Sequence, residues 1–106
     1  MVEWQDIQEM ARIIAERFRP RKIILFGSHA RGQGGANSDV DLLIVMDTDA
    51  PPHRRALPIR RALWDFACPK DILVRTPAEF ERARRQFWNV VCPADREGKV
   101  LYERPA

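Results

Sequence analysis

Lys22-Ile-Ile-Leu-Phe-Gly-Ser28, followed after ten residues by Asp39-Val-Asp-Leu-Leu-Ile-Val-Met46, decides both the fold and the chemistry of this chain. In the first stretch, four consecutive apolar residues stand between a lysine and a glycine, which predicts a strand buried on both faces over 22–26. The second stretch predicts another such strand over 40–46. The segment from Gly27 to Ser38 holds four of the five glycines and predicts a loop with a short helical turn near 28–31.

The rest of the chain alternates between helical and extended patterns. Apolar residues at helical spacing predict a helix from about Trp4 to Phe18, ended by Pro20. This order of elements predicts one domain over residues 1–106, with an α/β (α+β) fold in which helices flank a small mixed sheet of three to four strands. The further predicted elements are a helix over 58–66, a strand over 71–75, a helix from the capping box Thr76-Pro-Ala-Glu79 to about Trp88, a helical segment that Pro93 breaks or restarts and Gly98 ends, and a short strand over 100–102.

The composition narrows the classes of function. A chain of 106 residues makes one domain, so a large substrate must bring its own binding surface. The net charge of +3 comes from 18 basic and 15 acidic residues, and this balance does not favour a dedicated nucleic-acid binder. Cys68 and Cys92 lack the spacing of a zinc site and are expected to be buried thiols in a reducing cytosol. Without a signal peptide or an apolar run of about 18–20 residues, we expect a cytoplasmic protein that does not bind membranes.

Two carboxylates stand at the beginning of the second predicted strand. Asp39 and Asp41 are two residues apart, so a strand directs both side chains to the same face. Like charges held together repel each other, and a divalent cation with hard oxygen ligands, such as Mg²⁺, relieves that repulsion. The alternative is a solvated strand beginning in which Asp39 caps a turn.

Gly27 and Ser28 follow the first buried strand directly. A glycine there lets the backbone approach a ligand closely, and amides and a hydroxyl at a helix start bind phosphate oxygens. The alternative for this pair alone is an ordinary turn. Together, a phosphate site and a metal-binding pair at the ends of two neighbouring strands suit a nucleoside triphosphate with its Mg²⁺.

Asp71 begins the third predicted strand and supplies a third carboxylate. It could complete a two-metal site, or act as a general base on an attacking hydroxyl. The alternative is a strand-edge aspartate paired with Lys70 or with a nearby arginine.

Three residues of the glycine-rich loop have less decided roles. Arg31 could reach a phosphate or be a solvated loop arginine. Ser38 could touch the nucleotide or shape the turn before Asp39. His29 could stack on a base, but an exposed loop position is the plainer interpretation.

The combination of a buried strand, Gly27-Ser28, a ten-residue spacer and Asp39-Val-Asp41 resembles the signature of the DNA polymerase beta-like nucleotidyltransferase superfamily. The run Ala30-Arg-Gly32 and the ending Arg96-Glu-Gly-Lys-Val-Leu-Tyr-Glu103 are similar to its minimal branch. Pro58 and Cys92-Pro93 depart from the common pattern and leave helix boundaries open.

This resemblance implies a polymerase beta-like core, in which Gly27 and Ser28 hold the triphosphate of ATP and Asp39 and Asp41 bind Mg²⁺, with two ions expected. Asp71 matches the third family carboxylate by its place before an apolar strand. The resemblance also implies a small helical partner of the HEPN type, in a module like a toxin–antitoxin pair, whose tyrosine receives AMP.

We therefore expect an Mg²⁺-dependent nucleotidyltransferase that transfers a nucleoside monophosphate to a hydroxyl of a protein partner. The alternative is a non-catalytic, nucleotide-binding antitoxin or regulatory subunit that acts by binding its partner; homo-oligomers are compatible with either. Aromatic residues such as Trp64 and Phe80 are expected in the core or at an interface. Residues 87–91 with Leu101-Tyr102 form a candidate docking surface.

Overall fold

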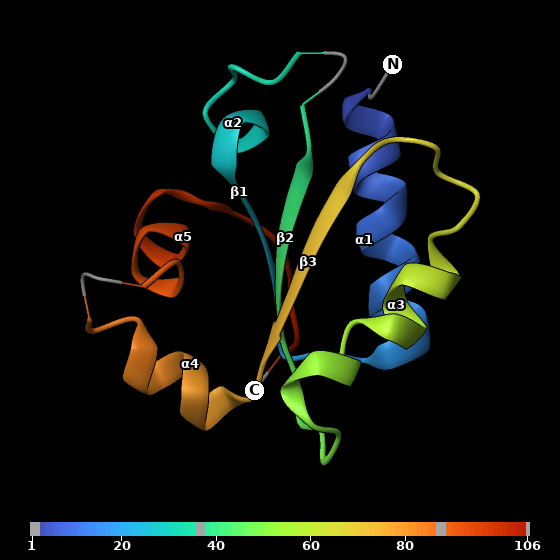
Figure 1. The fold of residues 1–106 in the computed structure, drawn as a ribbon. Coiled ribbons are helices and arrows are strands. Elements are labelled where there is room, and N and C mark those ends of the chain that lie inside the picture. Colours follow the sequence, from blue (N-terminus) through green and yellow to red (C-terminus); the bar gives the residue numbers. More distant parts are fainter. Residues whose placement is uncertain (1–2, 36–37, 87–88, 106) are drawn as a thin grey trace.

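The chain folds as one four-stranded sheet with helices on both faces (Figure 1), in a computed structural model that describes residues 3–35, 38–86 and 89–105. The mixed sheet with flanking helices confirms the predicted fold class. The elements in chain order are α1 (Trp4–Phe18), β1 (Lys22–Phe26), α2 (Gly27–Ala30), β2 (Val40–Val45), the 3₁₀ turn η1 (Pro52–Arg54), α3 (Leu57–Ala62), β3 (Lys70–Arg75), α4 (Pro77–Ala83), α5 (Val91–Glu97) and β4 (Lys99–Glu103).

The strands lie in the order β3-β2-β1-β4. β1 pairs antiparallel with β2, which places Phe26 opposite Asp41. β2 pairs parallel with β3, which places Asp41 opposite Asp71. β4 pairs antiparallel with β1, with an irregular register between Ile23 and Ile24. As a result, the end of β1 and the beginnings of β2 and β3 meet at the same end of the sheet.

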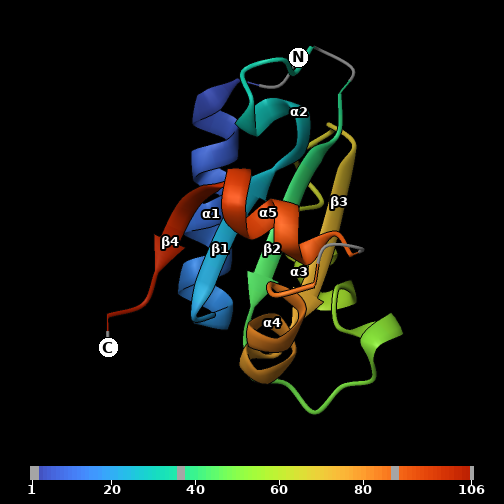
Figure 2. The same ribbon diagram turned by 90° about the vertical axis from the view of Figure 1, so that its left-hand side faces the viewer.

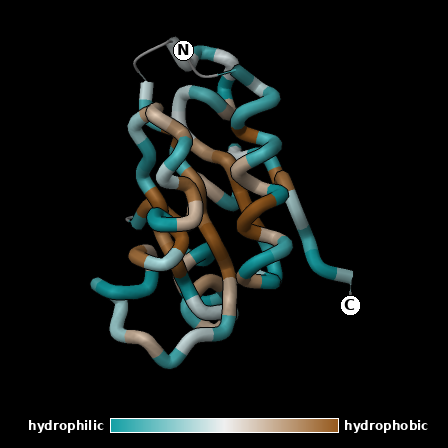
Figure 3. The backbone as a smooth tube through the Cα atoms, turned by 90° about the vertical axis from the view of Figure 1, so that its right-hand side faces the viewer, coloured by the Kyte–Doolittle hydropathy of each residue, from teal (hydrophilic) through white to brown (hydrophobic). Residues whose placement is uncertain are grey.

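Both faces of the central strands are covered. Leu42 and Ile44 of β2 pack into a core with α1 and α3, whereas Leu43 packs on the other face with α4 and α5. Figure 2 shows α4 and α5 in front of the sheet, and Figure 3 shows hydrophobic residues concentrated along its central strands. Burial on two faces explains why β1 and β2 are uninterrupted apolar runs rather than alternating patterns.

Helix α1 has the predicted bounds. Its amphipathic spacing buries one stripe of residues, including Met10 and Ile14, against the sheet. The helix ends where Arg19 adopts a left-handed conformation, with φ of 48°, and donates its amide hydrogen to the Ala15 carbonyl.

Helix α3 is shorter than predicted, because it ends at Ala62 instead of near Phe66. The amide of Trp64 bonds to the Arg61 carbonyl at 3.3 Å and that of Phe66 to the Leu63 carbonyl at 3.0 Å. These three-residue spacings are those of a tight 3₁₀-like turn, which closes the helix early. Pro58 lies in the first turn of α3, as expected.

Helix α4 begins at the predicted Thr76 capping box but ends at Ala83, before the predicted end at Trp88, which lies outside the described residues. The side-chain amide nitrogen of Asn89 donates a hydrogen bond of 3.0 Å to the Ala83 carbonyl. Its side-chain oxygen accepts one of 2.9 Å from the backbone amide of Val91. Asn89 thereby ends α4 and begins α5. Pro93 falls in the first turn of α5, so the helix restarts around it.

The structure corrects the expected exposure of Val91 and the expected burial of Cys68. Val91 is 1% exposed, so it cannot belong to the predicted docking surface, and residues 87–88 of that surface lie outside the described residues. Cys68 is only half-buried, although Cys92 is buried as expected. Phe80 lies in the core as expected, whereas Trp64 is 83% exposed, which excludes it from the core and leaves the interface alternative. Across the described residues, no helix combines the length and apolar character needed to span a membrane.

A partly buried ion pair ties the segment before α3 to α4. The Arg55 guanidinium donates two hydrogen bonds to the Glu79 carboxylate, at 2.6 and 3.3 Å. Glu79 also accepts the Thr76 amide hydrogen at 2.8 Å. The hydrogen bond from Arg55, followed by that from Thr76, lowers the pKa of Glu79 to about 2 from its ordinary 4.5.

We predict that Glu79→Gln lowers the free energy of unfolding at pH 7 by about 1.5–3 kcal/mol, the scale of hydrogen bonds to charged groups. Because the pKa of Glu79 is lower in the folded state, the loss is full above pH 4.5 and shrinks as pH falls toward 2. Urea unfolding at several pH values measures this. Glu81→Gln, which removes exposed ion pairs with Arg84 and Arg85, is the control and should cost less than about 1 kcal/mol. Equal losses of stability for the two variants would contradict a stabilising role for the ion pair between Arg55 and Glu79.

Candidate active site

The predicted site residues meet at one end of the sheet. Gly27 and Ser28 open α2 directly after β1, and Asp41 lies one strand away, opposite Phe26. Asp71 lies opposite Asp41 on β3. Because side chains alternate along β2, Asp41 points to the same face as Leu43, the face that α4 and α5 cover farther along the sheet.

Gly27 lies directly against Asp41. Its φ is +73°, a conformation that residues with a side chain rarely adopt, and a Cβ atom there would lie 2.1 Å from Asp41 Oδ2. The sequence predicts this glycine for the approach of a ligand. The structure adds a second reason, because a Cβ atom at this position would occupy the space of the Asp41 carboxylate.

The carboxylates repel one another. Burial raises the pKa of Asp41, and the charges of Asp71 and Asp39 raise it further, while His29 and Arg31 act in the opposite direction. Asp39 and Asp71 are exposed and Asp41 is half-buried. A fold selected only for stability gains nothing from this arrangement, so the cluster suggests a binding site for a cation or a cationic complex.

Within the described part of the chain, none of these three carboxylates forms an ion pair or accepts a side-chain hydrogen bond. The expected alternative partner of Asp71, Lys70, instead donates to the carbonyls of Phe66 at 2.5 Å and Cys68 at 2.9 Å. The oxygens of these three carboxylates are therefore available to a ligand.

The donor set fits Mg²⁺ shared with a phosphate ligand. Among the described residues, no three His, Cys, Asp or Glu side chains converge closely enough to enclose a metal ion by themselves. Mg²⁺ in proteins typically takes one or two carboxylates and completes its shell with substrate phosphates and water, so an open pair such as Asp39 and Asp41 suits it. The amides at the start of α2 have no carbonyl one turn earlier to bond with, which suits phosphate oxygens beside that pair.

The loop between α2 and β2 is held by its own residues. The Ser38 hydroxyl accepts the Gly35 amide hydrogen at 3.0 Å, so Ser38 shapes the turn before Asp39. His29 Nε2 lies 3.1 Å from the Ser38 carbonyl, and its half-buried ring differs from the expected exposed position. A Cβ on Gly34 would lie 2.3 Å from that ring, so the loop passes close over His29. Arg31 is exposed, and its Nε lies 3.5 Å from Gln33 Oε1.

A small pocket of about 150 Å³ opens beside Gly27, between α2 and α5. Phe26, Gly27 and Arg31 line one side of it. The other side comes from the α5 region, with Val90, Pro93, Ala94 and Glu97. These α5 residues are not among the site residues predicted from the sequence. The one available signal was helical spacing, which puts positions 90, 94 and 97 on one face.

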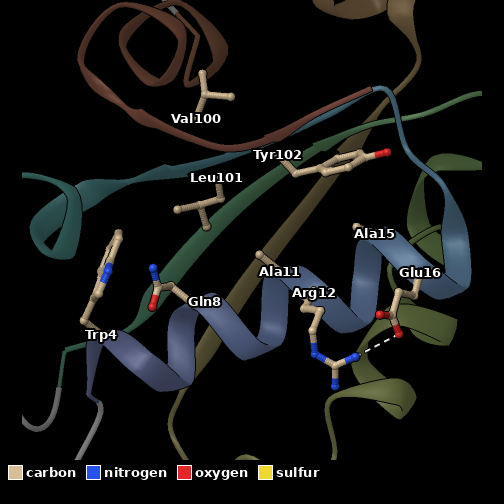
Figure 4. Close-up of a pocket in the computed structure, with 9 residues that line it drawn as sticks. All are labelled: Trp4, Gln8, Ala11, Arg12, Ala15, Glu16, Val100, Leu101 and Tyr102. Carbon is tan, nitrogen blue, oxygen red and sulfur yellow. Dashed lines mark hydrogen bonds and ion pairs between the residues drawn. The ribbon is translucent and has the colours of Figure 1, made fainter. Parts of the chain in front are cut away.

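A larger groove of about 500 Å³ lies elsewhere, between α1 and β4 (Figure 4). Trp4 and Leu101 flank it, and Leu101 points toward α1 whereas Val100 points away. Arg12 and Glu16 at its rim are paired with each other at 2.8 Å. The groove has no carboxylate cluster and is separate from the candidate active site.

We predict that Gly27→Ala destabilises the fold more than Gly32→Ala. Both glycines have φ of +73°, which costs a residue with a side chain roughly 1–2 kcal/mol, but a Cβ at Gly32 meets nothing within 4 Å. The difference between the two variants in urea unfolding therefore isolates the collision with Asp41. If both substitutions cost the same, the close packing of Gly27 on Asp41 is wrong.

Comparisons with known proteins show the family to which this chain belongs. The nucleotidyltransferase domain family matches residues 7–100. A bifunctional uridylyltransferase/uridylyl-removing enzyme of Methylococcus capsulatus is 38% identical over 81 residues, which cover 74% of this chain and 9% of the relative. A Methanocaldococcus jannaschii protein named "Putative protein adenylyltransferase" is 47% identical over 51 residues, covering 46% of this chain and 51% of that protein. The chain thus spans about half or less of these relatives.

Solved structures support the fold. A "putative nucleotidyltransferase" from Sulfolobus solfataricus aligns with a TM-score of 0.65 at 20% identity, covering 94% of this chain and 79% of that one. A toxin–antitoxin structure with AMP-PNP aligns with a TM-score of 0.59 at 19% identity, covering 93% and 73%. The family match over residues 7–100 confirms the resemblance inferred from Gly27-Ser28 and Asp39-Val-Asp41. The chain belongs to the nucleotidyltransferase domain family.

Proposed function

We propose that this nucleotidyltransferase transfers AMP from ATP to a hydroxyl group of a protein partner, in a reaction that requires Mg²⁺. The observation that carries the proposal is the meeting of Gly27-Ser28 with three carboxylates, none of them ion-paired to another described residue, at one end of the sheet. Nucleotidyl transfer needs a triphosphate held beside a metal-binding pair, and this arrangement supports the proposal of a site for each.

Each site residue has a role in this proposal. Gly27 and Ser28 hold the triphosphate through the amides at the start of α2 and the Ser28 hydroxyl. Asp39 and Asp41 hold Mg²⁺, and Asp71 is placed to complete the set; when bound, Mg²⁺ neutralises charge between these carboxylates and the phosphates. Arg31, whose charge already acts on Asp41, adds a further positive charge toward the phosphates. Ser38 keeps the loop before Asp39 in place.

The acceptor hydroxyl oxygen attacks the α-phosphorus in line with the bond to the bridging oxygen. A new phosphorus–oxygen bond forms to the acceptor, the bond to the bridging oxygen breaks, and pyrophosphate leaves. Asp71 accepts the hydroxyl proton as a general base. Its exposed position on the edge strand β3 leaves it open to an acceptor carried on another protein.

The nature of the acceptor is supported by the relatives. One relative is named "Putative protein adenylyltransferase", and one structural neighbour is a toxin–antitoxin structure with AMP-PNP. We therefore propose a small helical, HEPN-type toxin as the partner, with this chain as its antitoxin and a tyrosine as the modified residue. Binding without transfer, the non-catalytic alternative, is one outcome of the test below.

We predict that the protein, mixed with such a partner, ATP and Mg²⁺, adds AMP units to the partner in intact-mass spectra, and that EDTA stops the addition. Asp39→Asn and Asp41→Asn should abolish transfer, because each removes an anionic metal ligand. Asp71→Asn should slow it by about 10²–10⁴-fold, the usual contribution of a general base, while sparing most ATP binding.

Asp47→Asn is the matched control, since Asp47 follows the opposite end of β2 and pairs with Arg21. It should transfer AMP at the wild-type rate. If the wild type neutralises its partner without any mass change, and the variant carrying both Asp39→Asn and Asp41→Asn does so equally well, the protein acts by binding alone. Wild-type rates for Asp71→Asn would remove Asp71 from the mechanism.

A further inference from the structure

The pocket between α2 and α5 has the walls of a site for a flat heterocycle. Phe26 contributes an aromatic surface, and Val90, Pro93 and Ala94 contribute apolar ones. Its volume of about 150 Å³ is well below the roughly 300–1,000 Å³ of sites that take whole drug-sized ligands. It therefore suits one ring system of a larger ligand.

The pocket adjoins the proposed phosphate site. Gly27 belongs to both, and Phe26 beside it is paired in register with Asp41. Figure 2 shows α5 directly beneath α2, on the sheet face toward which Asp41 points. A nucleotide with its phosphates at Gly27 and Ser28 therefore has this pocket within reach.

Two residues of opposite charge line the pocket, Arg31 with Gly27 on one side and Glu97 on the α5 side. The cation suits the phosphates at the Gly27 side, whereas a carboxylate disfavours a phosphate, so the α5 side is left to the base. No ion pair joins Glu97 to another described residue, so its oxygens are free to accept hydrogen bonds. An ionised carboxylate only accepts, so it favours a base whose edge donates.

We propose that this pocket binds the nucleobase and that Glu97 is a specificity-determining residue that selects adenine over uracil. Adenine presents its 6-amino group as a donor, whereas uracil presents a carbonyl oxygen at the corresponding position, which Glu97 repels. This inference rests on the proposed function, because it requires the triphosphate to lie at Gly27 and Ser28.

Calorimetric titration of the whole protein with Mg²⁺–ATP and with Mg²⁺–UTP tests the selection. The wild type should bind ATP more tightly by about tenfold to hundredfold, the scale of one hydrogen bond to a charged group. Glu97→Gln should shrink that preference toward equality, because its amide can donate to the uracil carbonyl. Glu16→Gln, an exposed carboxylate of α1, should leave the preference unchanged.

Equal affinity of the wild type for the two nucleotides, or an unchanged preference in Glu97→Gln, would overturn this inference while leaving the proposed function standing. Binding of neither nucleotide would overturn both.

Photolabelling with 8-azido-ATP in the presence of Mg²⁺ gives an independent readout of position. Peptide mapping should find the label on residues 90–97, and excess ATP should compete it away. A label confined to α3 or β3 would place the base elsewhere and overturn the inference, even if Glu97→Gln changed the affinities.

Discussion

The repulsion among three carboxylates at one end of the sheet is the constraint that organises this molecule. Asp41 is half-buried beside the charges of Asp71 and Asp39, and its pKa is raised as a result. The described residues offer these groups no ion-pair partner. Apolar packing on both faces of β1 and β2 stabilises the sheet independently of that end, so the fold tolerates this repulsion.

The strand pairing creates this constraint. The parallel register of β2 with β3 sets Asp41 opposite Asp71, and the antiparallel register of β1 with β2 brings the start of α2 to the same place. Gly27 is then required because any side chain would occupy the space of the Asp41 carboxylate. The residues of the proposed phosphate site and of the proposed metal-binding pair thus come together through strand pairing.

Much of this could be predicted from the sequence, because the signals are local. Continuous apolar runs indicate β1 and β2, and the Thr76 capping box marks the start of α4. The ends of α3 and α4 could not be predicted, since 3₁₀ turns and the side chain of Asn89 decide them. The pocket beside α5 also escaped prediction, because Phe26 and Glu97 become neighbours only through tertiary packing. That the three carboxylates lie together depends on the strand order β3-β2-β1-β4, which agrees with the expectation that the strands carrying them are neighbours.

The central claim is that Asp41 binds a ligand and lowers the stability of the fold. The variant Asp41→Asn tests it most directly, with urea unfolding and Mg²⁺–ATP titration measured on the same protein. Because the pKa of Asp41 is raised, its ionised form weakens the fold at neutral pH, and this effect fades as pH falls toward the ordinary pKa of 3.8. The free energy of unfolding without ligand should therefore rise at pH 7 and approach the wild-type value near pH 4. Affinity for Mg²⁺–ATP should fall by at least about tenfold to hundredfold, the loss seen when even groups that only orient metal ligands are removed. A less stable variant that still binds Mg²⁺–ATP like the wild type would contradict the account.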